Sequence, residues 1–234
     1  MILSALDPQT EAALVEHLLQ FVTPSKRARM EAVIARRTDR IQVVLEDIYQ
    51  PHNASAVMRS CECFGIQNLH VIENRYEYTV NRDVAMGSSK WITLHRYREE
   101  AADNTKTCME ALRQKGFRIV ATSLDPGSVP LDEFSLDENT SLWFGTEEEG
   151  LSQTVLESAD EHVHIPMDGF TQSFNISVSA ALCLYELRRK LVQGDLPWQL
   201  SESRKNEIYR LWLRNIVKNA DILERGFLKE NLPQ

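Results

Sequence analysis

Residues 164–186, HIPMDGFTQSFNISVSAALCLYE, combine the end of a strand, a polar loop and the start of a helix. The strand is expected to stop at Pro166, because proline has no backbone N–H for the ladder. Ser173 and Asn175 stand where the helix should begin, and both residue types are favoured as N-caps. The helix is almost free of charge, which predicts that neighbouring elements pack tightly around it. Its start presents unpaired N–H groups to whatever lies in front of it.

Strand and helix patterns alternate through the middle of the chain. Strands are expected at residues 41–46, 69–72, 91–94, 117–122, 141–144 and 163–165, and helices at 52–64, 99–115, 152–159 and from about 175 onward. Residues 74–90 are polar and show no clear period. The apolar strands are typical of a sheet that is covered on both sides. This order predicts an α/β fold with a mostly parallel sheet and helices on both faces.

Helical patterns flank this middle part on both sides. We expect a helical N-terminal extension over residues 1–40, an α/β domain over 41–193 and a helical C-terminal extension over 194–234. The last clear helix, about residues 201–218, could pack on the N-terminal helices, cover the sheet or bind a partner. The final stretch, residues 226–234, is expected to fray.

The net charge of −8 argues against a protein that coats nucleic acid by charge alone. A local exception is residues 24–40, where six basic side chains against two acidic ones give +4. This segment is either a solvated helix face or a patch that binds phosphates. Both interpretations fit the sequence taken alone.

The four cysteines match no zinc or redox spacing and stand in apolar contexts, which predicts free core thiols in a reducing compartment. The sequence shows no apolar run of about 20 residues and no secretory signal, so we expect a cytoplasmic protein without membrane association. The six histidines do not cluster, and no metal is predicted. Dinucleotide, Walker and nucleophile-elbow motifs are also missing, which argues against those classes of site.

Polar segments follow three of the predicted strands. Residues 50–59 contain Asn53 and Arg59, residues 144–152 place two glycines around three acids, and the third segment is the stretch quoted above. Each alone has an ordinary structural interpretation, such as a helix cap or an acidic turn. Ligands in α/β folds bind where strands end. Together, the three segments therefore predict one ligand site.

Three segments resemble in sequence the three motifs of the SPOUT-class RNA methyltransferases. They are PHNASAVMR (51–59), FGTEEEGL (144–151) and IPMDGFTQSFNISV (165–178). They are most similar to the TrmH branch, which methylates the ribose 2′-OH of a guanosine in the tRNA D-loop. The resemblance runs from about Arg36 to Lys190. It implies a C-terminal deep trefoil knot, an exception to the rule against threaded chains. It also implies an S-adenosylmethionine pocket formed by the knot and a homodimer through the knot region.

The resemblance implies roles for individual residues. Backbone groups around five residues are expected to hold the cofactor: Thr122, Gly145, Ile165, Met167 and Phe174, the last standing where leucine is usual. Five residues are expected to form the catalytic site: Asn53 and Glu147 through hydrogen bonds, Ser173 and Asn175 by shaping the loop and helix start, and Arg59 by assisting removal of the 2′-OH proton.

The role of Arg59 needs a physical qualification. A free arginine stays protonated, with a pKa above about 12, so it is a poor proton acceptor. A charged Arg59 is better suited to hold the neighbouring phosphate in place. In that case either the phosphate accepts the proton, or the 2′-OH loses its proton late in the methyl transfer.

Segments outside the knot help to hold tRNA in this family. The resemblance therefore favours phosphate contacts from basic side chains in the two extensions: Lys26, Arg27, Arg29, Arg36, Arg37, Arg40, Arg204, Lys205 and Arg214.

The predicted function is methyl transfer from S-adenosylmethionine to the 2′-OH of a tRNA guanosine, G18 of the D-loop. One alternative is a ribosomal-RNA 2′-O-methyltransferase of the same fold, but such enzymes often carry a separate mixed α/β N-terminal domain. Here only about forty helical residues precede the first strand. Another alternative is a non-catalytic RNA-binding protein of this fold, which predicts a degraded site. The intact set of candidate catalytic residues argues against it.

Overall fold

The computed structural model describes residues 6–231 and divides into two compact units. The larger unit is Thr38–Trp198. The smaller unit combines the residues up to Arg37 with those from Gln199 onward. Most of the two predicted extensions therefore forms one unit, whereas residues 38–40 and 194–198 belong to the larger unit. Of the three possibilities for the last predicted helix, packing on the N-terminal helices is the one that the structure shows.

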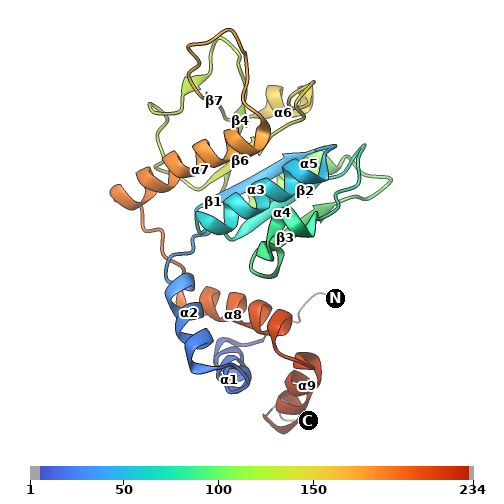
Figure 1. The fold of residues 1–234 in the computed structure, drawn as a ribbon, viewed down its shortest axis with the longest axis vertical. Coiled ribbons are helices and arrows are strands. Elements are labelled where there is room, and N and C mark those ends of the chain that lie inside the picture. Colours follow the sequence, from blue (N-terminus) through green and yellow to red (C-terminus); the bar gives the residue numbers. More distant parts are fainter. Residues whose placement is uncertain (1–5, 232–234) are drawn as a thin grey trace. The chain divides into compact units, whose positions relative to one another are not determined.

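The larger unit is built on a parallel sheet with the strand order β3-β2-β1-β6-β4-β7-β5 (Figure 1). All pairings between these strands are parallel, so the sheet is more regular than the mostly parallel one predicted. The strands are β1 (Ile41–Glu46), β2 (Asn68–Ile72), β3 (Thr93–Tyr97), β4 (Arg118–Thr122), β5 (Val129–Pro130), β6 (Thr140–Phe144) and β7 (Glu161–His164).

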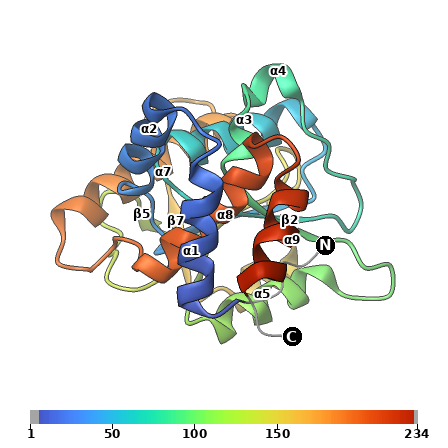
Figure 2. The ribbon, with the colours of Figure 1, turned by 90° about the horizontal axis from the view of Figure 1, so that it is seen from below.

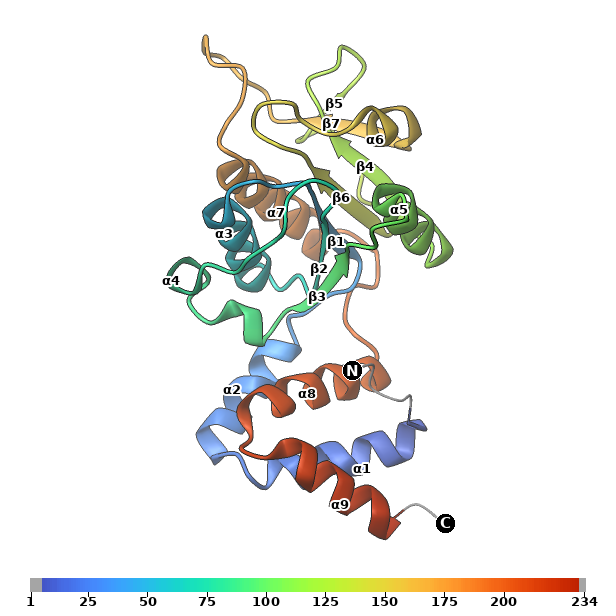
Figure 3. The same ribbon diagram turned by 90° about the vertical axis from the view of Figure 1, so that its right-hand side faces the viewer.

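Helices cover both faces of this sheet, as predicted (Figure 3). On one face lie α3 (Pro51–Cys63) and α7 (Ile176–Gln193), and on the other lie α5 (Asn104–Gln114) and α6 (Gln153–Ser158). Successive side chains of a strand point to opposite faces. In β1, Val43 and Leu45 accordingly pack with α3 and α7, whereas Val44 packs with α5. The α/β fold is confirmed, and the trefoil knot stays a prediction.

Several boundaries differ from the sequence prediction for local reasons. The helix expected from residue 99 begins at Asn104, because the side chain of Asp103 caps it through the N–H of Lys106 at 3.0 Å. Strand β3 begins at Thr93 because Trp91 still ends a short 3₁₀ helix, η1 (Ser88–Lys90). The polar segment before it also holds α4 (Arg82–Ala85). The two-residue strand β5 was not predicted.

The smaller unit consists, in its described part, of α1 (Pro8–Leu19), α2 (Pro24–Ile34), α8 (Glu202–Ile216) and α9 (Ala220–Asn231). Helices from the two ends of the chain lie side by side, α1 against α8 and α9 (Figure 2). The fraying expected from residue 226 is wrong up to Asn231, since α9 runs to that residue. Residues 232–234 lie outside the described part. No helix within residues 6–231 is long and apolar enough to cross a membrane.

A buried ion cluster joins three helices of the smaller unit. The guanidinium of Arg210 contacts Glu224 and lies 3.4 Å from Glu11, and all three side chains are buried. Arg214 contacts the same Glu224 carboxylate at 3.0 Å. Because a buried charge needs a partner of opposite sign, this cluster requires α1, α8 and α9 to be in place together.

Candidate active site

A cavity of about 480 Å³ lies at the carboxyl ends of β4, β6 and β7. These strands are neighbours in the parallel sheet, so the loops that follow them meet at one edge. The five residues predicted to hold a cofactor all line this cavity: Thr122, Gly145, Ile165, Met167 and Phe174. Ser173 lines it as well, three residues before the first residue of α7.

The loop after β6 closes tightly on Gly145. Thr146 and Gly150 exchange two backbone hydrogen bonds of 2.9 and 3.1 Å, which turns the loop back on itself. A Cβ added to Gly145 would lie 2.0 Å from the carbonyl carbon of Gly150 and 2.2 Å from the nitrogen of Leu151. Only glycine fits at position 145 without moving the backbone of this loop.

One carboxylate joins the three predicted segments. Glu147 Oε1 accepts hydrogen bonds from the side-chain amides of Asn53 at 3.0 Å and Asn175 at 2.6 Å. The Asn175 amide also donates to Asn53 Oδ1 at 3.2 Å. We call these three residues the Glu147 junction. Asn175 is in addition the N-cap of α7, where its Oδ1 accepts from the N–H of Ser177 at 2.9 Å.

A second cavity, of about 240 Å³, lies on the other side of the loop after β6. The segment Thr146–Glu149 and Ile176 line both cavities. Asn53 and the loop after β1, with Ile48, Tyr49 and Gln50, line only the second one, as does Tyr76. The Glu147 junction therefore stands between two cavities that share one wall.

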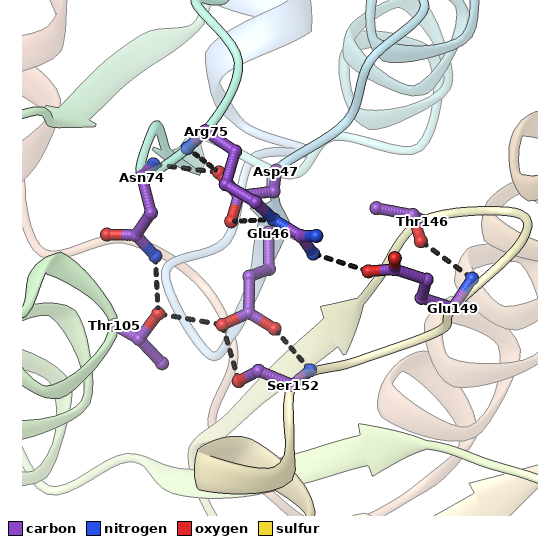
Figure 4. A network of polar contacts seen from close by, with 8 residues as sticks. All are labelled: Glu46, Asp47, Asn74, Arg75, Thr105, Thr146, Glu149 and Ser152. Carbon is purple, nitrogen blue, oxygen red and sulfur yellow. Dashed lines mark hydrogen bonds and ion pairs between the residues drawn. The ribbon is translucent and has the colours of Figure 1, made fainter.

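A buried carboxylate behind the loop fixes its far end (Figure 4). Glu46, the last residue of β1, accepts hydrogen bonds from Thr105 Oγ1 at 2.7 Å, Ser152 Oγ at 2.8 Å and Ser152 N at 2.8 Å. A buried carboxylate is costly unless it is well hydrogen-bonded, and these bonds satisfy it. Glu46 thereby ties the loop after β6 to the end of β1 and to α5.

An exposed ion pair holds the middle of the same loop. Arg75, in the loop after β2, lies 2.7 Å from Glu149 (Figure 4). The Arg75 guanidinium lowers the pKa of the Glu149 carboxyl. Cys183 also lines the larger cavity, but burial raises the pKa of its thiol to about 12. This thiol stays protonated, so the site has no activated cysteine nucleophile there.

Arg59 is not brought to these groups. It lies on the exposed side of α3 and lines neither cavity. No hydrogen bond or ion pair joins the Arg59 side chain to the other residues that the structure describes. Four of the five predicted catalytic residues thus lie in the Glu147 junction or line the larger cavity. Arg59 does neither.

The predicted phosphate contacts differ in their surroundings. Arg37 is 1% exposed, with its guanidinium 5.5 Å from the Trp212 ring, so the structure does not present it to a phosphate. Arg40 belongs to the larger unit and donates to Pro197 O and Asn139 Oδ1, both at 2.7 Å. Lys26, Arg29 and Arg36 are exposed. Carboxylate partners are seen for four others: Arg27, Arg204, Lys205 and Arg214.

Glu46, Tyr49 and Tyr76 were not among the predicted site residues. A signal was available for Glu46, because a charged residue that ends a buried strand needs partners at the carboxyl edge of the sheet. No pattern in the sequence pointed to Tyr49 and Tyr76, because the two side chains come together only when the loops after β1 and β2 fold.

The larger cavity matches the chemistry of S-adenosylmethionine. Its wall is apolar at Phe144, Leu156 and Ile165, and Asp125, whose carboxylate accepts from Ser123 Oγ at 3.0 Å, also lines it. Apolar side chains suit an adenine ring, and a carboxylate suits a positively charged ammonium or sulfonium group. The residues present therefore fit this cofactor.

Comparisons with known proteins agree with this geometry. Residues 40–185 match the SpoU rRNA Methylase family. The chain is 42% identical over 207 residues to the tRNA (guanosine(18)-2′-O)-methyltransferase of Borreliella burgdorferi, covering 88% of this chain and 93% of the relative.

Solved structures give the same result. A TrmH/SpoU tRNA modifying enzyme of A. aeolicus has a TM-score of 0.72 at 30% identity and covers 83% of this chain and 98% of its own. The SpoU methyltransferase AviRb from Streptomyces viridochromogenes, in complex with the cofactor AdoMet, has a TM-score of 0.59 at 27% identity. The match covers 69% of this chain and 64% of that one.

The substitution Gly145→Ala should disrupt the loop between the cavities. Its Cβ would overlap backbone atoms, which cannot move aside as a flexible side chain can. We expect a loss of about 3 kcal/mol in the free energy of unfolding, at the upper end of overpacking effects. Urea denaturation measures this loss, and calorimetric titration should show weaker S-adenosylmethionine binding.

Gly127→Ala is the matched control, since a Cβ there would meet no atom within 4 Å. It should leave stability and cofactor binding unchanged. Equal effects of the two substitutions would contradict the close approach at Gly145.

Proposed function

Because the chain belongs to the SpoU rRNA methylase family, we propose that it transfers a methyl group from S-adenosylmethionine to the ribose 2′-OH of guanosine 18 in tRNA. The observation that carries the proposal is the Glu147 junction, where residues far apart in the chain meet between two adjoining cavities. One cavity suits the methyl donor, which leaves the other side for the RNA.

The chemistry required of the protein is mainly positioning. The bound cofactor supplies a sulfonium-linked methyl group, which is already a strong donor. Holding the 2′-oxygen in line with that group can then supply much of the rate, because fixed geometry replaces an improbable encounter. The backbone of the loops at Gly145 and Ile165 is suited to hold the donor, and the Glu147 junction fixes the loops between donor and acceptor.

The relatives favour tRNA over ribosomal RNA as the substrate. The match to the Borreliella enzyme spans more residues than the α/β unit contains, so it extends into the helical unit. In this proposal the helical unit helps to hold tRNA, with Lys26, Arg29 and Arg36 as its exposed phosphate contacts. Arg27, Arg204, Lys205 and Arg214 belong to the same proposal, and each would release its carboxylate partner on binding a phosphate. The non-catalytic alternative is disfavoured by the intact site.

We also propose that the protein is a cytoplasmic homodimer in which α7 and the knot region form the interface. Along one side of α7, Val178, Leu182 and Tyr185 are exposed and recur at helical spacing. An exposed apolar stripe of this kind is typical of an interaction surface. Arg59 is also exposed, and a second copy could bring it to a cavity that its own chain does not offer.

The direct test uses labelled S-adenosylmethionine with unmodified tRNA and, separately, ribosomal RNA. We expect label in tRNA alone and a 2′-O-methyl group on guanosine 18 when the product is mapped. Label in ribosomal RNA alone would favour the alternative substrate. Cofactor binding without transfer to either RNA would favour the non-catalytic alternative.

The variant Arg59→Ala should abolish turnover but keep the affinity for S-adenosylmethionine, because Arg59 lines neither cavity. Activity and calorimetric titration measure the two properties. A loss of cofactor affinity with the fold unchanged would refute this role.

Mixing two inactive variants shows whether Arg59 acts across the dimer. Arg59→Ala and Glu147→Ala, unfolded and refolded together, should regain part of the activity, because a mixed dimer holds one site with both groups intact. If the mixture stays inactive although mixed dimers form, Arg59 does not act on the partner's site.

A further inference from the structure

Two exposed tyrosines stand together at the second cavity. Tyr49 follows β1 and Tyr76 follows β2, and the two residues are 69% and 38% exposed. The ring centroids lie 5.0 Å apart in an edge-to-face arrangement. Neither ring belongs to the core of the unit. The Arg75 guanidinium lies 5.9 Å from the Tyr76 ring, but core packing does not explain why both rings line this cavity.

Buried polar groups hold the two loops in this arrangement. Asp47 is buried and has a left-handed backbone, with a φ of 53°. Its Oδ1 accepts from the N–H groups of Asn74 at 2.7 Å and Arg75 at 2.8 Å, as Figure 4 shows. This carboxylate ties the loop that carries Tyr76 to the residue two positions before Tyr49. The positive φ of a non-glycine residue costs free energy, so the arrangement depends on these hydrogen bonds.

Glu148 supplies an acceptor on the shared wall. Its neighbours are engaged, Glu147 in the junction and Glu149 with Arg75. The exposed Glu148 carboxylate lines both cavities and has no hydrogen bond or ion pair with the residues described in the structure. An ionised carboxylate only accepts hydrogen bonds, so its partner must be a donor.

We propose that the second cavity binds the guanine base of the target nucleoside. Tyr49 and Tyr76 form a stacking surface for the base, and the Glu148 carboxylate accepts from guanine N1–H and the N2 amino group. The inference rests on the proposed function, because the ribose must reach the Glu147 junction while the methyl donor occupies the larger cavity. A base attached to that ribose then has the second cavity within reach.

The chemistry of this cavity selects among the parts of an RNA. The row of carboxylates at Glu147–Glu149 repels phosphate, so the backbone is disfavoured here. Unstacked RNA bases are commonly bound by aromatic stacking and by hydrogen bonds to their Watson–Crick edge. Guanine places two adjacent donors on that edge. Adenine places an acceptor at N1, which would face the carboxylate.

Substitutions of the tyrosines test the stacking surface. Tyr49→Ala and Tyr76→Ala should raise the KM for tRNA by about tenfold to a hundredfold, the range that corresponds to one lost base–aromatic stack. Calorimetric binding of S-adenosylmethionine should not change. Tyr49→Phe and Tyr76→Phe should retain the low KM, because they keep the ring. An unchanged KM in both alanine variants, or an equal loss in the phenylalanine variants, would overturn the stacking role.

A substrate with inosine tests whether Glu148 recognises the guanine N2 amino group. Inosine lacks the N2 amino group, so the wild-type protein should methylate a tRNA with inosine at the target position about tenfold less efficiently, the loss expected for a hydrogen bond to a charged group. Glu148→Gln should lower kcat/KM for guanosine and bring the guanosine-to-inosine ratio close to one. A change in cofactor affinity alone would not move this ratio.

Glu110→Gln is the control for the loss of one negative charge. Glu110 is exposed on α5, on the opposite face of the sheet from α3, and lines neither cavity. This variant should keep the wild-type ratio. If wild-type protein does not distinguish inosine from guanosine, or Glu148→Gln retains the distinction, the guanine site is wrong.

These outcomes separate the two proposals. A wild-type protein that methylates no tRNA would overturn the proposed function and the base site with it. An active wild-type protein whose tyrosine and Glu148 variants behave like the Glu110 control would overturn the base site alone.

Discussion

The candidate site depends on the hydrogen bonds that the Glu147 carboxylate accepts. It holds two side-chain amides, one from the start of α3 and one from the start of α7, at 3.0 and 2.6 Å. Hydrogen bonds to an ionised acceptor are stronger than neutral ones, which suits a contact that must fix three separate segments. Because the loop that carries Glu147 is the wall between two cavities, its position determines the shape of both.

Two buried carboxylates at the end of β1 support this arrangement from behind. Glu46 binds the end of the loop after β6, and Asp47 binds the loop after β2. Arg75 then connects those two loops through Glu149. A functional site is precise only when its loops are held by such supporting contacts. Here the supports come from adjacent strands, whose carboxyl ends the parallel sheet brings to one edge.

Much of the fold could be predicted because its signals are local. The β1 strand, IQVVLE, is mostly apolar, and Asn175 is an N-cap whose side chain bonds to the N–H two residues on, so neither signal depends on distant parts of the chain. Local sequence could not reveal that Arg37 is buried beside Trp212, since the two meet only when both ends of the chain pack together. The prediction that neighbouring elements pack tightly around α7 is wrong on one side of the helix, where Val178, Leu182 and Tyr185 are exposed, because apolar residues are common in buried helices and in interfaces alike.

The resemblance to the methyltransferase motifs identified which polar residues belong together, and the structure gives the geometry that motifs lack. The position of Arg59 shows the limit. Its place in a motif predicts a role beside Asn53, yet both lie on the same helix six positions apart and face different ways. Motif membership does not establish that two residues serve the same site of one chain.

The most direct measurement of the central claim is a double-mutant cycle on single-turnover methyl transfer, with Asn53→Ala, Glu147→Ala and the double variant. If the junction acts as one unit, the second substitution should add little to the first, with a coupling free energy of about 1 kcal/mol or more. Strictly additive losses, with the fold and cofactor binding retained, would contradict the claim that these residues act together.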